Sequence, residues 1–178
     1  MSGRRTQYAA LLALMLVACG ANPAPRPPAA GLERGAPPDG KPLLAVDAAR
    51  ASAEGAEQTR VIAVEAATPG DRVSGTLIVP QNRCVLLLAR VSDSIDDVDL
   101  FAYSDAGEVL GSDERPDKEP SLLVCPPHPK RIYVVARVAS GHGLVAVGGQ
   151  LVAPEKADGA AKAVGHQPPA SEASVWSY

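Results

Sequence analysis

An alternation with a period of two along residues 96–111 is the feature that most constrains the fold. It places two sets of side chains on opposite faces of an extended chain, the apolar set Val98, Leu100 and Ala102 and the acidic and aromatic set Asp97, Asp99, Phe101 and Tyr103. Turn formers follow at residues 104–107, with Gly107 free to take a positive φ, and Val109 then starts a return strand. The segment therefore predicts an antiparallel hairpin with one apolar face.

Short apolar segments separated by turn formers continue from residue 60 to residue 152. The turn signals fall at residues 68–71, 80–82, 92–93, 113–120, 126–129 and 140–143. Residues 85–89 are continuously apolar, which is typical of a strand buried on both faces. This spacing predicts an all-β fold, a single antiparallel β-sandwich or jelly roll of about 7–8 short strands.

Two segments of this region resemble a known family. Residues 97–103, with Gly107 and the pair Val109-Leu110, resemble the signature of bacterial pre-peptidase C-terminal (PPC) domains. Residues 131–138 and the turn at 140–143 resemble the closing strand and turn of the same family. The resemblance implies a small jelly-roll sandwich in an exported protein, and it transfers no catalytic residue.

The N-terminal residues 1–18 have the pattern of a bacterial lipoprotein signal peptide. Arg4 and Arg5 form a basic start, an apolar segment follows, and residues 16–19 (Leu-Val-Ala-Cys) have the form of a lipobox. We expect Cys19 to carry diacylglyceryl and palmitate chains that attach the protein to a membrane. Because Gly20 rather than an aspartate follows, the sorting rule for enteric bacteria favours the outer membrane, on its periplasmic or surface face. The alternatives are an ordinary signal peptide with an incidental cysteine, and twin-arginine export.

The other parts of the chain differ in composition. Residues 19–42 are rich in Pro, Ala and Gly, which predicts a disordered tether. Residues 43–59 are predicted to be a marginal helix or a loop, because Gly55 interrupts a weak apolar stripe. The sandwich domain is expected at residues 60–152, and a disordered tail at residues 153–178.

Two cysteines remain once Cys19 is assigned to the lipid. In an oxidising compartment an even pair is most simply a disulfide, so a bridge between Cys84 and Cys125 is predicted. Closing that loop contributes about 4 kcal/mol through chain entropy. The alternative is a metal site formed by the two cysteines and His128, which lacks a fourth ligand and a recognised spacing. We therefore expect no metal and no cofactor.

The carboxylates allow two interpretations. Asp97 and Asp99 share one strand face, and Asp93, Asp96 and Asp113 are predicted near the same end of the sandwich. Such a set of oxygen ligands suits Ca²⁺, whereas the alternative is a solvated acidic edge that discourages pairing with another strand. The sequence has no nucleophile elbow, Gly-rich phosphate loop or zinc-protease His pair, and paired acids of the glycosidase kind stay open.

Three functions remain open from the sequence. The first is a non-catalytic binding module of the cell envelope with a protein or glycan partner, whose candidate binding surface is Asp97, Asp99, Phe101 and Tyr103. The alternative for the two rings is burial beneath the second sheet or a loop. The second function is a structural or accessory subunit of an envelope complex, and the third is a minor envelope hydrolase. A net charge of −3 argues against a nucleic-acid partner.

Overall fold

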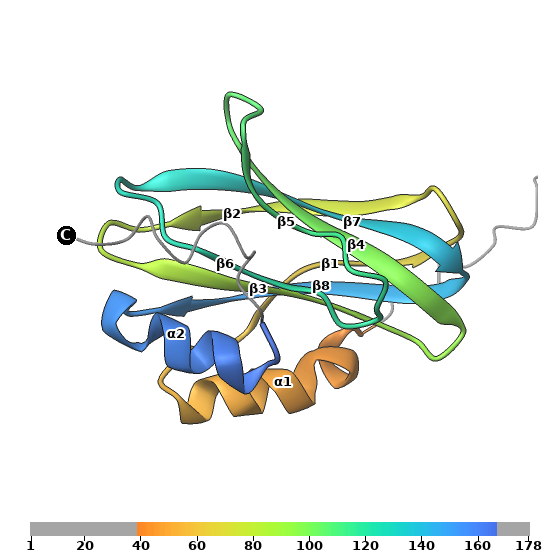
Figure 1. Cartoon of the computed structure of the whole chain (residues 1–178), viewed down its shortest axis with the longest axis horizontal. Helices are drawn as coiled ribbons and strands as arrows, with labels where there is room; N and C mark the ends of the chain where they lie inside the picture. The colour runs from red at the N-terminus through yellow and green to blue at the C-terminus, as the bar shows by residue number, and fades with distance from the viewer. Residues whose placement is uncertain (1–38, 167–178) are drawn as a thin grey trace, which may run out of the picture. The chain divides into compact units, whose positions relative to one another are not determined.

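A computed structural model describes residues 39–166, which form two four-stranded sheets packed face to face (Figure 1). One sheet has the strand order β1-β8-β3-β6, the other has the order β2-β7-β4-β5, and all neighbouring pairs are antiparallel. The strands are β1 Arg60–Ala67, β2 Arg72–Val79, β3 Cys84–Val91, β4 Ile95–Ser104, β5 Val109–Asp113, β6 Ser121–Val124, β7 Lys130–Gly141 and β8 Gly143–Val152. This strand order is that of a jelly roll, so the predicted fold class is confirmed.

The hairpin predicted from the alternation is formed by β4 and β5. Tyr103 lies opposite Val109, and the turn between the strands is closed by the N–H of Gly107, which donates to the carbonyl oxygen of Ser104 at 3.0 Å. Gly107 has a φ of 81°, the left-handed conformation that favours glycine. The Ser104 hydroxyl oxygen accepts hydrogen bonds from the N–H groups of Ala106 and Glu108, each at 3.2 Å. The turn is therefore fixed by the residues that predicted it.

The core lies between the two sheets. Because side chains alternate along each strand, Val98, Leu100 and Ala102 of β4 point inward and are fully buried, as are Ile132 and Val134 of β7. Strand β3 is buried on both faces, because its alternate side chains contribute to this core and to a second cluster beneath the helices. Residues 85–89 are continuously apolar because both faces of this strand are buried.

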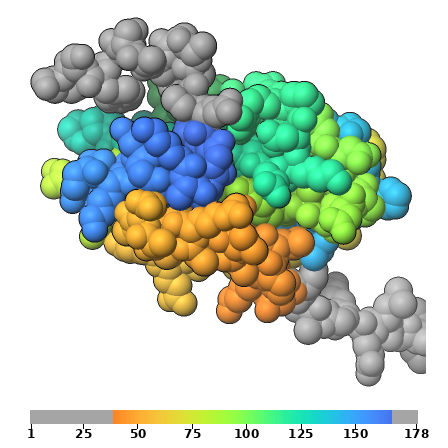
Figure 2. Space-filling model, turned by 60° about the horizontal axis from the view of Figure 1, so that its bottom comes forward, coloured from red at the N-terminus to blue at the C-terminus, as the bar shows by residue number. Residues whose placement is uncertain are grey.

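Two helices cover the outer face of the sheet that contains β8 and β3. These are α1 Lys41–Ala53 and α2 Pro154–Ala163, which lie side by side on the surface (Figure 2). Helix α1 contributes Leu44 and Ala51 to the cluster beneath it, and Gly55, with a φ of 96°, follows the helix end. Neither helix is long and apolar enough to cross a membrane, a finding that concerns residues 39–166 alone.

Helix α2 corrects the expectation of a disordered tail from residue 153. Pro154 begins the helix, where its fixed φ suits the first turn and its missing N–H is not needed. Ala157, Ala160, Ala161 and Val164 then recur at helical spacing and are buried against the sheet. The sequence analysis did not predict this helix, because a segment rich in alanine resembles low-complexity sequence. The expected tether, residues 19–42, also ends too late, because Lys41 and Pro42 belong to α1.

The signal peptide, the lipidation site Cys19 and residues 167–178 lie outside the described residues. The expectations for these segments therefore stay predictions.

Candidate contact surface

The outer face of the sheet β2-β7-β4-β5 is the candidate functional surface, because neither α1 nor α2 lies over it (Figure 1). We call the outward side chains of this sheet the open face. They are Arg72, Ser74, Thr76 and Ile78 on β2, Arg131, Tyr133, Val135 and Arg137 on β7, Asp97, Asp99, Phe101 and Tyr103 on β4, and Val109 and Ser112 on β5. All four residues of the predicted binding surface belong to this face.

The centre of the open face is aromatic. Tyr103 lies opposite Tyr133, Phe101 lies opposite Val135, and the rings of Phe101 and Tyr103 stack with centroids 6.1 Å apart and planes inclined by 21°. Between residues 39 and 166 the sequence has three Phe, Tyr or Trp residues, and all three are on this face. None of them belongs to the buried core.

Exposed apolar side chains continue this aromatic centre toward both edges of the sheet. Tyr133 is 41% exposed, Ile78 on β2 is 58% exposed and Val109 on β5 is 63% exposed. Phe101 and Tyr103 are half-buried, and the second sheet does not cover them. The sequence alternative placed both rings beneath the second sheet or a loop, and its first form, cover by the second sheet, is wrong.

An ion pair fixes one end of the ring stack. Arg137 on β7 donates to Asp99 Oδ2 from Nη2 at 2.7 Å and from Nε at 2.9 Å, and its guanidinium lies over the Phe101 ring, 5.5 Å from the centroid. The hydrogen bonds with Asp99 raise the pKa of Arg137 above its ordinary value. Asp99 is 4% exposed, so it is not the free acidic group that the sequence suggested. Its role in this geometry is to hold Arg137 against the ring.

Asp97 is the second acidic residue of the face and has a different environment. Its side chain is half-buried, and Oδ1 has no hydrogen-bond partner among the described residues. Burial raises the pKa of Asp97, and the nearby charge of Asp99 raises it further. Asp97 is therefore a carboxyl group on the open face with one oxygen that lacks a hydrogen-bond partner among the described residues.

The other predicted acidic groups do not gather into a ligand set. Asp93 and Asp96 are exposed, whereas Asp113 is buried and accepts hydrogen bonds from Arg115 Nε and Nη2, each at 2.8 Å. Within residues 39–166 there is no group of three or more His, Cys, Asp or Glu side chains that could hold a metal ion. The described carboxylates are instead partnered by arginines or spread over the surface.

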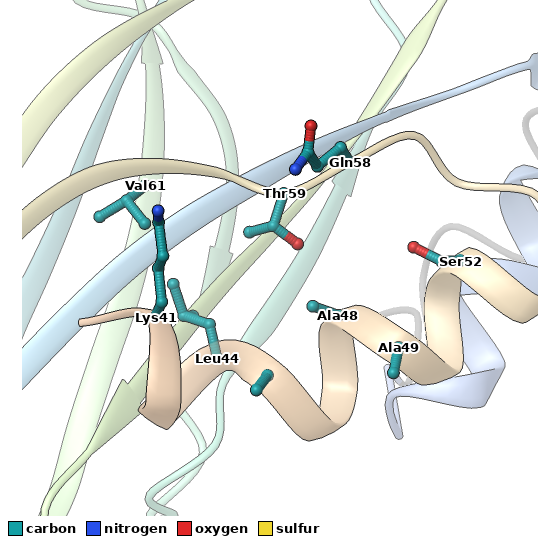
Figure 3. Close-up of a pocket in the computed structure, with 9 residues that line it drawn as sticks. Lys41, Leu44, Ala48, Ala49, Ser52, Gln58, Thr59 and Val61 are labelled. Atoms are coloured by element: carbon teal, nitrogen blue, oxygen red, sulfur yellow. The ribbon is translucent and has the colours of Figure 1, made fainter. Parts of the chain in front are cut away.

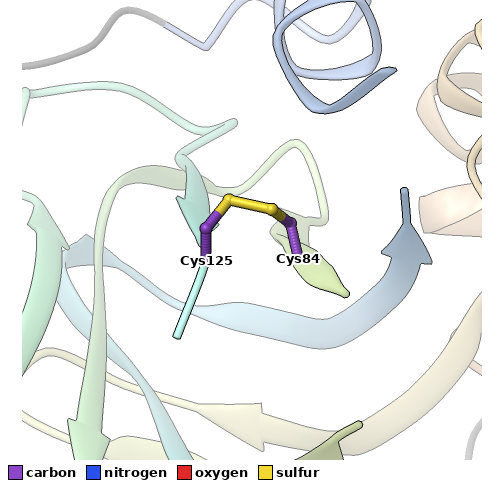
Figure 4. Close-up of a disulfide and its surroundings, with 2 residues drawn as sticks. All are labelled: Cys84 and Cys125. Atoms are coloured by element: carbon purple, nitrogen blue, oxygen red, sulfur yellow. A yellow bond between two sulfur atoms is a disulfide. The ribbon is translucent and has the colours of Figure 1, made fainter. Parts of the chain in front are cut away.

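The predicted disulfide between Cys84 and Cys125 is confirmed (Figure 4). Cys84 begins β3 and Cys125 directly follows β6, and these strands are antiparallel neighbours with Val85 opposite Val124. The register therefore brings the two cysteines together at the same end of the pair. The bridge lies on the sheet that carries the helices, away from the open face.

A hollow of about 310 Å³ lies between α1 and the start of β1 (Figure 3). It is lined by Lys41, Leu44, Ala45, Ala48, Ala49, Ser52, Gln58, Thr59 and Val61. Its polar side chains are Lys41, Ser52, Gln58 and Thr59, and no carboxylate or imidazole is among the lining residues. The hollow therefore has no acid–base pair for catalysis.

A second hollow of about 550 Å³ lies beside the end of β6 and α2. Its ionisable side chains are Lys130, Asp158 and His166, and His166 Nδ1 is 2.8 Å from the carbonyl oxygen of Ser121. Cys125 also lines it, but the disulfide leaves no thiolate to act as a nucleophile. His128 is exposed and is not among the residues that line this hollow.

Sequence reasoning found the four residues of the open face on β4 and missed those on β2, β7 and β5. Tyr133, Val135, Arg137 and Arg131 alternate with buried residues along β7, so a period-two analysis of residues 131–137 would have found them. That these β7 residues lie beside the predicted residues of β4 could not be found in this way, because the pairing of β4 with β7 joins residues that are far apart in the sequence.

Comparison with known proteins finds similarity in structure but none in sequence. A scan against protein-family models finds none, and a search of curated proteins by sequence finds none either. Three similar solved structures are a C-terminal CBM6 of a laminarinase from Zobellia galactanivorans, a periplasmic inhibitor of g-type lysozyme from Aeromonas hydrophila, and a carbohydrate-binding module of a lichenase from Cellvibrio mixtus.

The similarity to these three structures is distant. The Zobellia module is 16% identical, with 56% of this chain and 94% of that chain covered and a TM-score of 0.35. The Aeromonas inhibitor is 12% identical, with 55% and 89% covered and a TM-score of 0.37. The Cellvibrio module is 13% identical, with 55% and 88% covered and a TM-score of 0.33. At these values the similarities carry no argument about what this chain binds.

Proposed function

We propose that this protein is a lipid-anchored, non-catalytic binding module of the bacterial cell envelope, and that the open face is its contact surface. The observation that carries the proposal is the placement of Phe101, Tyr103 and Tyr133 on one sheet face that no other element of residues 39–166 covers. Large aromatic side chains stabilise a fold most when they are buried in the core, and here the core is built from Val, Leu, Ile and Ala instead. Exposed aromatic side chains gathered in one patch are typical of interaction surfaces.

The contrast between the two outer faces supports the same function. The outer face of the sheet β1-β8-β3-β6 is apolar and is covered by α1 and α2. The open face carries apolar and aromatic side chains without such a cover, so a partner would remove this area from water. The ring stack is held by Arg137 and Asp99, which limits the side-chain entropy lost when a partner binds.

The envelope location and the anchor rest on the sequence. The lipobox at residues 16–19 supports lipidation of Cys19, and Gly20 supports the outer membrane as the destination. The resemblance of residues 97–110 and 131–143 to PPC domains supports an exported setting, and we propose a distant relationship with that family. A structural subunit of an envelope complex would use the same face for a permanent partner.

The anchor is tested by the variant Cys19→Ala. We expect it to leave membrane and detergent fractions, because no acyl chains are attached to it. The N-terminal peptide of the wild-type protein, analysed by mass spectrometry, should begin at Cys19 and carry the mass of the lipid. Membrane retention of the variant, together with an unmodified wild-type peptide, would contradict the lipid anchor.

The contact surface is tested by a photoreactive side chain at the centre of the open face. We expect Tyr133→p-benzoylphenylalanine to give an adduct with a protein or a glycan in intact envelopes, because this side chain is 41% exposed beside the ring stack. The matched control is the same residue at Val46, which is 62% exposed on α1 and remote from the open face. Equal labelling from both positions, or no adduct with either a protein or a glycan from Tyr133, would contradict the assignment.

A further inference from the structure

We propose that the occupant of the open face is an acidic polysaccharide, a chain of sugar rings that carry carboxylates. This inference rests on the proposed function, since it names the partner of the same face. Three properties of the face support it: the charges at its two ends, its limited size and the polar groups that surround the rings.

Among the described residues, the open face carries two cations without an ion-pair partner, beside one acid, Asp97, that has none either. Arg72 and Arg131 are exposed, and neither makes an ion pair with another residue in the range 39–166. Three arginines on the face against Asp97 and Asp99 leave it with one net positive charge, while the whole chain has a net charge of −3. Glu114, just after β5, and Asp117 add negative charge beside Arg137 and Asp97. The groups that an anionic partner would complement are therefore the two unpaired guanidinium groups of Arg72 and Arg131.

The cations are placed at opposite ends of the aromatic centre. Arg131 and Arg137 are outward residues of the same strand, β7, with Tyr133 and Val135 between them. Six residues of strand span about 20 Å. Arg72 lies directly opposite Arg137 at the far end, where Asp99 offsets the charge of Arg137. A ligand lying along β7 would therefore meet a guanidinium, then rings, and then a second guanidinium.

The size of the face favours a linear polymer over a protein domain. A standard protein–protein interface uses about 20–30 residues on each side. The open face has fewer outward side chains, because the sheet has four strands and β5 is short. A second copy of this chain is a poor occupant as well, since it would bring Arg72 and Arg131 against another positively charged face.

The polar groups beside the rings suit a carbohydrate. Thr76 lies opposite Tyr133, Ser112 lies opposite Phe101, and Ser74 lies opposite Val135. A sugar ring has apolar C–H faces that pack on aromatic rings, and hydroxyl edges that exchange hydrogen bonds with such groups. A uronate adds a carboxylate, which the planar guanidinium of arginine can bind with two hydrogen bonds. The open face provides both kinds of contact.

The test is affinity electrophoresis of the purified full chain in gels that contain polygalacturonate or hyaluronate, with neutral dextran as the control polymer. Retardation by at least one acidic glycan and none by dextran is the expected result.

Variants separate specific binding from simple ion exchange. Tyr133→Ala, and Arg72→Ala combined with Arg131→Ala, should each weaken binding by about tenfold or more, as expected of side chains at the centre and the charged ends of a contact. The controls are Arg83→Ala, which removes a partly exposed arginine paired with Glu57 away from this face, and Val46→Ser on α1. Both controls should bind like the wild type.

Three outcomes overturn the inference. They are no binding to any acidic glycan, equal binding to dextran, and binding that responds to the arginine variants but not to Tyr133→Ala. A protein adduct from the photoreactive Tyr133 variant, without glycan binding, would leave the proposed function standing and remove the polysaccharide. Absence of both would remove both proposals.

Discussion

Asp47→Ala is expected to destabilise the protein by about 3–5 kcal/mol, because it leaves a buried arginine without its counter-ion. Arg90 on β3 donates from Nε to Asp47 Oδ2 at 2.6 Å, and the two side chains are 4% and 8% exposed. Arg90 Nη1 also donates to the carbonyl oxygens of Ala89 and Pro120, at 2.7 and 3.0 Å. These carbonyls cannot neutralise the charge that the substitution would leave.

Urea denaturation provides the measurement, and two variants serve as controls. Arg50→Ala removes the exposed second partner of Asp47 and should cost less than about 1 kcal/mol. Asp47→Ala with Arg90→Met removes both charges, so it should be more stable than Asp47→Ala alone. A loss below about 1 kcal/mol for Asp47→Ala would contradict the expectation, and would mean that α1 separates locally so that Arg90 reaches water.

Removing the disulfide is the second large effect. The double variant Cys84→Ala, Cys125→Ala should lose about 4 kcal/mol, the chain-entropy contribution of a bridge between residues that are 41 apart. For a domain of this size the melting temperature should fall on the order of 10–15 °C. Scanning calorimetry of the variant, and of the wild type with and without reductant, provides the measurement.

Cys19→Ala is the control for this experiment, because it removes a cysteine outside the bridge and should leave the melting temperature unchanged. Non-reducing peptide mapping should find Cys84 linked to Cys125. Two alkylatable thiols in freshly isolated protein, or an unchanged melting temperature after reduction, would contradict a stabilising bridge.

The parts of the fold that the sequence predicted correctly depend on local pattern. The β4–β5 hairpin follows from alternation and from turn residues such as Gly107, which act over a few positions. The disulfide follows from the even number of cysteines in an exported chain. These signals need no knowledge of which strands become neighbours.

The parts that were missed depend on contacts between distant segments. Asp99 was predicted as a surface acid, but Arg137 neutralises it across a strand pair whose register the sequence does not state. Asp47 is buried because Arg90, on another element, provides a counter-charge. Helix α2 was missed because its buried stripe is made mostly of alanines. How much an alanine stabilises the packing depends on how closely the helix approaches the sheet, which the sequence does not give.

The central claim is that the ring stack on the open face touches a partner and not the protein's own core. Its most direct test is the photoreactive side chain at Tyr133 in a chain that also carries Phe101→Ser and Tyr103→Ser. We predict that the adduct seen with the intact stack disappears, while the melting temperature stays within about 2 °C of the parent, as for other surface substitutions. An adduct that persists would contradict the claim, and so would a melting temperature that falls by about 10 °C or more, because the rings would then belong to the core.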